Sequence, residues 1–196
     1  MIKVGLNIGN SKISCVVSEI KANKKVQLLS YQDIPSNLLK KNMITNFDDL
    51  SKEIRNLLKE SEKNSQTKIN SINLNIPTID SLSKYYHGEI KNLNQKINEL
   101  DIKKIINNSE YFNIENDYHQ LINYINNYSL DGNLLVDSPI GNYANELKVF
   151  FYKILIPNKT IKIYKNIIES LGISIESFVP SPLSSALATL SNDEKR

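Results

Sequence analysis

Apolar residues recur along the first thirty positions in short runs that predict β-strands. The runs cover residues 2–8, 13–20 and 26–31, and turn-forming residues separate them at positions 9–11 and 23–24. Segments joined by such short connections can pair only as antiparallel neighbours. We therefore expect the chain to open with an antiparallel meander.

A helix and a further strand are predicted next. Residues 33–45 read as a loop, after which Asn46 can cap a helix with its side chain, and Asp48 and Asp49 suit the positive end of the helix dipole. One apolar stripe follows at helical spacing and consists of Leu50, Ile54, Leu57 and Leu58. Residues 71–76 alternate strictly between apolar and polar side chains, which predicts a strand with one buried face.

The pattern of predicted strands and helices changes from about Ile79 onward. Strand candidates at residues 81–90 and 117–130 flank a short helix that Asn98 can cap. The apolar side chains of this helix are Ile102, Ile105 and Ile106. A nearly continuous apolar strand at residues 147–156 ends the segment, so we expect a small α+β module inserted into the main domain.

The main domain is predicted to resume after the module. Asn158 can cap a helix that Gly172 stops in a left-handed conformation, and residues 173–179 form a further strand. Ser181 and Pro182 suit the cap and first position of a last helix. We expect Leu183, Ala186, Leu187 and Leu190 to align on one face of that helix.

Composition narrows the class of protein. The 196 residues are 40% hydrophobic and 23% charged, which is typical of a folded globular chain, and the net charge of +3 comes from scattered lysines rather than from a basic patch. We expect no nucleic-acid partner. The lone Cys15 falls in an apolar run and is interpreted as a packed thiol, while His87 and His119 lack the partners of a metal site.

The strongest candidate for chemistry is the turn after the first strand. Backbone amides of a glycine-bearing turn can converge on an anion, and polar side chains there can add donors. The candidate phosphate-loop residues are Gly5, Asn7, Gly9, Asn10, Ser11 and Lys12. Taken alone, the segment is equally well explained as an ordinary hairpin turn, because it lacks the spacing of a Walker loop.

The order of elements, with strands, a helix, an insertion and then helix, strand and helix, resembles a ribonuclease H-like actin subdomain. Over nearly its whole length the chain resembles the N-terminal half of FtsA, the bacterial actin-like cell-division family. The residues that carry the resemblance are Val4 to Ile13, Pro35-Ser36, Leu39-Lys40-Lys41, Tyr128 with Ser138-Pro139-Ile140-Gly141, Leu147-Lys148-Val149, and Pro182 to Ala186 with Ala188, Leu190 and Asp193-Glu194-Lys195.

The resemblance implies an α/β fold in which an actin-like subdomain 1A, residues 1–79 and 158–196, is interrupted by a small SHS2-type subdomain 1C, residues 80–157. It implies ATP with magnesium as the cofactor of the full-length family. It also implies FtsZ and other division proteins as partners, self-association into filaments through 1C, and a place at the cytoplasmic face of the inner membrane. No apolar run approaches the ~20 residues of a membrane span, so we expect a cytoplasmic chain without a membrane segment of its own.

Departures from the family pattern shape the remaining expectations. Asn7 stands where actin-like families usually place a carboxylate that orients the magnesium hydration shell, and Asn42 replaces a family glycine. The second actin lobe, with its own phosphate loop and the FtsZ-docking 2B domain, does not follow, so we expect negligible ATP binding and no enzymatic activity from this chain alone. Two alternatives remain open: a PilM-type pilus-assembly actin homologue, and a fragment of an acetate or sugar kinase.

Overall fold

The structure, a computed structural model, describes residues 1–40, 43–108, 117–191 and 193–194. They form two compact units, one built from Met1–Ile79 with Thr160–Arg196 and the other from Asp80–Lys159. Lys41, Asn42 and Lys195, which contribute to the resemblance above, lie outside the described residues.

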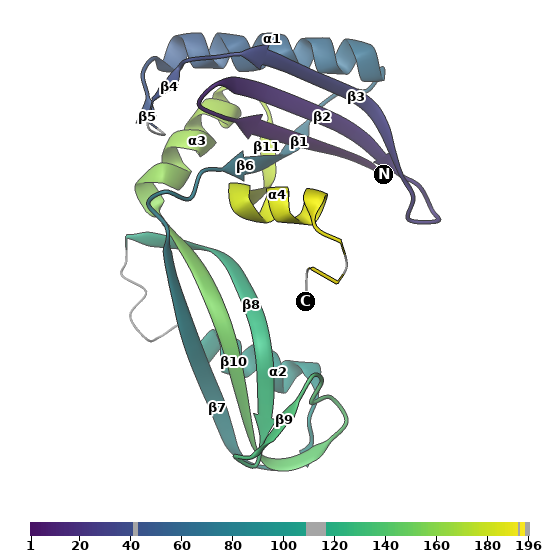
Figure 1. Ribbon diagram of the computed structural model, residues 1–196, viewed down its shortest axis with the longest axis vertical. Coiled ribbons are helices and arrows are strands. Elements are labelled where there is room, and N and C mark those ends of the chain that lie inside the picture. The colour runs from purple at the N-terminus through teal and green to yellow at the C-terminus, as the bar shows by residue number, and fades with distance from the viewer. Residues whose placement is uncertain (41–42, 109–116, 192, 195–196) are drawn as a thin grey trace. The chain divides into compact units, whose positions relative to one another are not determined.

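The first unit is built on a five-stranded sheet of order β11-β6-β1-β2-β3 (Figure 1). Its strands are β1 (Ile2–Ile8), β2 (Lys12–Ile20), β3 (Val26–Pro35), β6 (Ser71–Ile76) and β11 (Ser174–Pro180). The first three pair antiparallel, which confirms the predicted meander, and β6 pairs parallel with both β1 and β11. This mixed sheet is the core of the actin-like α/β fold.

Helices α1 (Phe47–Ser65) and α3 (Asn158–Ser170) supply the apolar stripes of this unit. The predicted α1 stripe is buried in full, and the Asn46 side chain accepts a hydrogen bond from the Asp49 amide at 3.1 Å, as expected of a cap. Helix α3 begins at Asn158 itself, so Asn158 lies inside the helix instead of capping it. After this helix Gly172 adopts the predicted left-handed conformation, with φ +78°.

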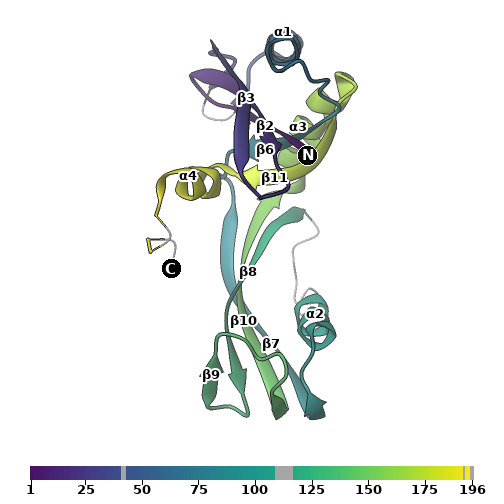
Figure 2. The same ribbon diagram turned by 90° about the vertical axis from the view of Figure 1, so that its right-hand side faces the viewer.

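Strand alternation gives the sheet one apolar face and one polar face. The apolar face is buried through side chains of β1, β2 and β6, namely Val4, Leu6, Ile8, Ile13, Cys15, Val17, Ile72, Leu74 and Ile76. Cys15 is therefore a packed core thiol, as predicted, and burial raises its pKa. The intervening side chains, including Asn7 and Asn75, point to the opposite face. Helix α4 (Ser181–Thr189) lies on that opposite side of the sheet from α1 and α3 (Figure 2).

The start of α4 differs from the prediction. Pro180 occupies the cap position, whereas the Ser181 hydroxyl donates to the carbonyl of Ile76, because a bond to the neighbouring strand competes with capping. None of the α4 residues is buried, and Leu187 is 56% exposed. The aligned apolar residues of α4 are thus not buried in this structure.

The predicted loop at residues 33–45 is also partly wrong. Strand β3 continues to Pro35, and two short strands, β4 (Leu39–Lys40) and β5 (Met43–Ile44), pair antiparallel beyond it. Two-residue strands carry too little periodicity to be recognised from sequence.

The second unit is a four-stranded antiparallel sheet of order β7-β10-β8-β9, with helix α2 (Glu99–Asn108) on one face. Its strands are β7 (Leu82–Lys96), β8 (Tyr118–Leu130), β9 (Leu134–Val136) and β10 (Tyr143–Pro157). Asn98 accepts hydrogen bonds from the amides of Leu100 and Asp101, which confirms it as the cap of α2. Strands β7 and β10 are longer than predicted, β8 agrees with its predicted range within one residue, and β9 was not predicted.

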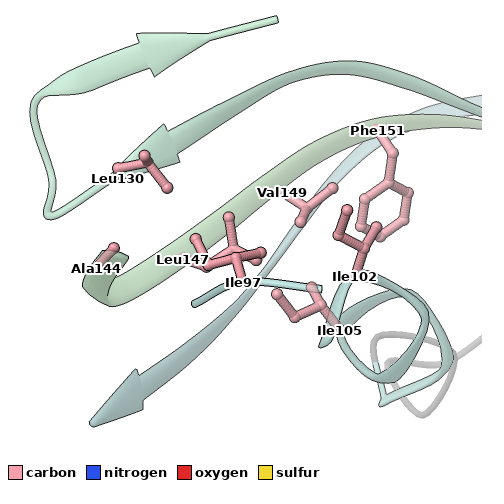
Figure 3. Packing of buried hydrophobic residues seen from close by; sticks show 8 residues of the cluster. All are labelled: Ile97, Ile102, Ile105, Leu130, Ala144, Leu147, Val149 and Phe151. Atoms are coloured by element: carbon pink, nitrogen blue, oxygen red, sulfur yellow. The ribbon is translucent and has the colours of Figure 1, made fainter. Parts of the chain in front are cut away.

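The core of the second unit lies between α2 and the sheet. Figure 3 shows Ile102 and Ile105 of α2 directed at Val149, Leu147 and Phe151 of β10. Successive β10 residues alternate between this core and the other face, so Phe151 is buried while its neighbour Phe150 is half-buried on the face without a helix. Among the described residues, no helix combines the length and apolar character needed to cross a membrane.

We expect Phe151→Ala to destabilise the second unit by about 3–5 kcal/mol, because it opens a cavity in the α2 core. The matched variant Phe150→Ala removes the same atoms from the half-exposed face, and we expect a loss of only about 1 kcal/mol. Hydrogen exchange of the β8 and β10 amides, measured over a series of urea concentrations, gives the free energy of unfolding of the second unit in both variants. Equal losses for the two variants would contradict the placement of this core.

Candidate functional site

The turn between β1 and β2 is closed by its own backbone. The amide of Gly9 donates to the carbonyl of Lys12 at 3.0 Å. A Cβ added to Gly9 would lie 3.0 Å from that same carbonyl oxygen, closer than nearly all observed Cβ contacts. The turn therefore needs glycine at position 9, whereas Asn10 and Ser11 are exposed at its tip.

Lys12 is directed along the neighbouring strand. Its ammonium donates to the Asp33 carboxylate at 3.0 Å and to the Tyr31 hydroxyl at 3.2 Å, both on β3. The hydrogen bond with Asp33 raises the pKa of Lys12, and the same bond lowers the pKa of Asp33. The cation is thus already paired with an anion in the absence of any ligand.

An open pocket of about 240 Å³ lies on the polar face of the sheet. Its lining comes from β1, β2, β6, β11 and α4, and consists of Gly5, Leu6, Asn7, Ser14, Val16, Asn73, Asn75, Val179 and Ser184. A Cβ added to Gly5 would meet nothing within 4 Å, so the missing side chain leaves space at the floor of the pocket. A larger residue at position 5 would fill that space.

A chain of hydrogen bonds links α4 to the two central strands across this pocket. The Ser184 hydroxyl donates to Asn75 Oδ1 at 3.1 Å, and Asn75 Nδ2 donates to Asn7 Oδ1 at 2.9 Å. The acceptor oxygen of Asn7 is thereby engaged, so its Nδ2 group remains as a donor. Asn7 thus offers a donor to a ligand oxygen, while its Oδ1 keeps a second lone pair that can accept a further hydrogen bond.

The structure brings only part of the predicted phosphate loop to the pocket. Gly5 and Asn7 line it, while Gly9, Asn10, Ser11 and Lys12 belong to the turn beyond it. Sequence reasoning missed Asn75 and Ser184 as lining residues. The alternation of residues 71–76 did place the asparagines of β6 on the face opposite the core, and that was the only signal pointing to them.

The donor set of the pocket fits an anion better than a divalent cation. Its described lining offers amides and hydroxyls, and contains no carboxylate. Across the described part of the chain, no group of three histidine, cysteine, aspartate or glutamate side chains is arranged to hold a metal ion. Magnesium is held by carboxylates and by substrate phosphates, so the protein groups of this pocket do not by themselves form a magnesium site.

Comparisons with known proteins identify both units. The profile of the SHS2 domain inserted in FtsA matches residues 81–155, which form most of the second unit. The cell division protein FtsA of Neisseria meningitidis is 27% identical over 190 residues, covering 97% of this chain and 46% of that protein. FtsA of Buchnera aphidicola from Schizaphis graminum is 26% identical over 196 residues, with the same two coverages.

The second unit thus matches the SHS2 domain of FtsA, and the chain over nearly its whole length is similar to FtsA proteins. The chain spans about half the length of the FtsA proteins that it matches. Among solved structures, the PilM–PilN type IV pilus biogenesis complex has a TM-score of 0.55 at 13% identity, and the match covers 94% of this chain and 49% of the other. That likeness shows a shared fold. The FtsA matches include both the pocket strands and the inserted module, since they run over nearly the whole chain.

The Lys12–Asp33 pair gives a direct test of the turn geometry. We expect the pKa of Asp33 to lie below 3.8 and to rise toward that value in Lys12→Gln, while Lys25→Gln leaves it unchanged. Because the folded pKa is lowered, the stabilising effect of the pair is present above the ordinary pKa and is lost as pH falls through the folded one. An NMR titration of the Asp33 carboxyl checks this, and equal pKa values in all three proteins would refute it.

Proposed function

We propose that the chain provides the first lobe of an FtsA-type cell-division actin together with its inserted interaction module. Residues 1–79 and 158–196 act as subdomain 1A, and residues 80–157 act as subdomain 1C. The observation that carries this proposal is the SHS2 match, which falls within an insertion between β6 and β11 of an actin-like sheet. The site of action is the cytoplasmic face of the membrane at the division site.

Subdomain 1A contributes one side of a nucleotide site in this proposal. The phosphates of ATP approach the pocket, where the side-chain amide of Asn7 and the hydroxyl of Ser14 offer donors and Gly5 leaves space. One sheet face provides these groups, and each of their hydrogen bonds contributes about 1 kcal/mol net to binding. The chain therefore binds ATP weakly by itself. Magnesium enters the site bound to ATP, since phosphate oxygens and waters provide most of its ligands.

The role proposed for the site is conformational and not enzymatic. Phosphotransfer to a sugar or to acetate requires a general base close to the acceptor hydroxyl or a comparable acidic group. The amides and hydroxyls among the described lining residues have no suitable pKa for that task. A nucleotide held there would act by stabilising one arrangement of the protein.

Subdomain 1C serves as the contact module for other division proteins. Within the described residues of this module, α2 covers one face of the sheet, and the other face exposes Tyr85 and Tyr124 beside Phe150 and Tyr152. Exposed aromatic side chains are enriched at protein interfaces, because they bury large area at low entropic cost. FtsZ, full-length FtsA and later division proteins are the candidate partners.

A pilus-assembly role is the second candidate, favoured by the likeness to the PilM–PilN complex. The two roles share the fold and differ in partner. The curated relatives that match over nearly the whole chain are FtsA proteins, which favours the division role.

We expect millimolar ATP to shift the side-chain amide signals of Asn7 and Asn75 in an NMR titration, with a dissociation constant weaker than about 1 µM. Gly5→Val should abolish these shifts because the added side chain fills the pocket floor. Ser18→Val is the matched control on the same face of β2, outside the pocket lining, and should leave them intact. Submicromolar binding, or shifts that persist in Gly5→Val, would count against the site.

A two-hybrid matrix in bacteria separates the two candidate roles. We expect the chain to pair with full-length FtsA or with later division proteins, and to show no signal with PilN. Tyr124→Ala tests the aromatic face of 1C in the same matrix, with Ile79→Ala as an exposed control outside that face. A signal with PilN alone would replace the division role by the pilus role.

A further inference from the structure

Strand β7 forms a long open edge of the second sheet. It runs over 15 residues, and its register with β10 is continuous from Leu82 to Lys91. Beyond Lys91 the strand is distorted, because Asn92 and Asn94 take positive φ values of 59° and 44°. The opposite edge of the sheet is formed by β9, which has only 3 residues, and by the part of β8 before Tyr128, which β9 does not cover. A long edge strand presents a row of backbone donors and acceptors that another strand can pair with.

The open edge is not shared with another described strand. Within the described ranges, the sheet order places β10 beside β7 and no strand on its other side. Natural proteins usually shorten or blunt such edges. The length of the regular segment therefore suggests that a strand of a partner covers it.

The sequence of β7 is complementary to itself around Gly88. In an antiparallel pair of two identical strands with the two-fold axis at Gly88, His87 of one copy lies opposite Glu89 of the other. Tyr85 lies opposite Lys91, and Tyr86 lies opposite Ile90. Every charged or basic side chain of residues 85–91 thus meets an acidic or aromatic one, and the apolar pair meets on the face that carries α2.

Neighbouring registers lose this complementarity. Moving the axis to Glu89 places the two Glu89 carboxylates opposite each other and sets His87 against Lys91. Moving it to His87 sets the two His87 rings opposite each other and Lys84 against Ile90. Like charges directly opposite are destabilising in a sheet, and opposite charges and aromatic pairs are stabilising. The pattern therefore selects one register.

We propose that β7 pairs with β7 of a second copy of this chain, antiparallel and centred on Gly88, to join the two sheets of the second units into one. The contact is isologous, so it closes a two-fold dimer and leaves no further β7 edge open. It depends on β7 alone and stands whether or not the nucleotide pocket or the division role is correct.

The side chains near the axis are already arranged to receive the second copy. Tyr85 is 76% exposed, and its ring lies 4.9 Å from the ring of Tyr152 on β10 at a tilted angle of 60°, which leaves most of the Tyr85 side chain accessible to Lys91 of the second copy. Glu89 bonds to Lys91 at 3.0 Å and to Lys148 at 3.2 Å, and these bonds lower its pKa and keep it ionised. His87 of the second copy would meet a carboxylate that is held in place.

The first experiment measures self-association of the 196-residue chain by sedimentation equilibrium over a concentration series. We expect a monomer–dimer equilibrium that Tyr85→Lys weakens about tenfold, because the variant places two lysines opposite each other twice in the dimer. Tyr124→Lys is the matched control, since Tyr124 is 62% exposed on the same face but lies on β8, which β10 separates from the β7 edge. Circular dichroism verifies that both variants fold.

Two results would overturn the proposal in this experiment. One is a chain that stays monomeric up to its solubility limit. The other is equal weakening by Tyr85→Lys and Tyr124→Lys, which would assign the association to the aromatic face instead of the edge.

The second experiment tests the register with single cysteines and a short thiol–thiol crosslinker. We expect a mixture of His87→Cys and Glu89→Cys chains to form crosslinked dimers, and either variant alone to form few, because residue 87 lies opposite residue 89 and not opposite itself. The native Cys15 is fully buried and does not compete. Efficient crosslinking of His87→Cys alone would show a different axis and contradict the proposal.

Discussion

The two-residue period of β1 and β6 is the constraint on which the first unit depends. Because successive side chains point to opposite faces, the same two strands that bury Leu6 and Leu74 also present Asn7 and Asn75 on the other face. A shift of one residue in the pairing of β1 with β6 would exchange the two sets and place asparagines in the core. The core therefore fixes the register, and the register places the two amides 2.9 Å apart. The pocket is a consequence of how the sheet must bury its apolar face.

The same rule explains which parts were predictable from sequence. Strands and helices with a clear period, such as β1, β6, α1 and α2, were found with their caps, because each signal lies within a few adjacent residues. The pocket was found only in part. Asn7 bonds to a residue 68 positions away, and Asn75 bonds to one 109 positions away, so their meeting depends on strand order and not on any local pattern. Gly5 and Asn7 were recognisable because they stand in a glycine-bearing segment.

The errors also have local physical causes. The stretch at residues 33–45 contains strands of two residues each, too short to show alternation. Ser181 precedes a proline and has the composition of a cap, yet its hydroxyl bonds to the carbonyl of Ile76, so tertiary contact with β6 replaces the local role. Helix α4 has an apolar stripe at helical spacing, but such a stripe indicates only that one face of the helix can be buried. In this structure Leu183, Leu187 and Leu190 remain exposed.

In the second unit, the alternation of side chains leaves one face of the sheet open. In β10 the buried set Leu147, Val149 and Phe151 faces α2, and the intervening set faces outward without a helix over it. A sheet covered on one side can bind a partner through its open face or through its open edge. These two surfaces differ in the partners that they can recognise. The face offers aromatic area with little directional preference, whereas an edge strand imposes direction, register and pairing of specific side chains. The charge order of β7 around Gly88 therefore bears on the edge, because a strand that runs beside β7 places one fixed side chain opposite each of its residues.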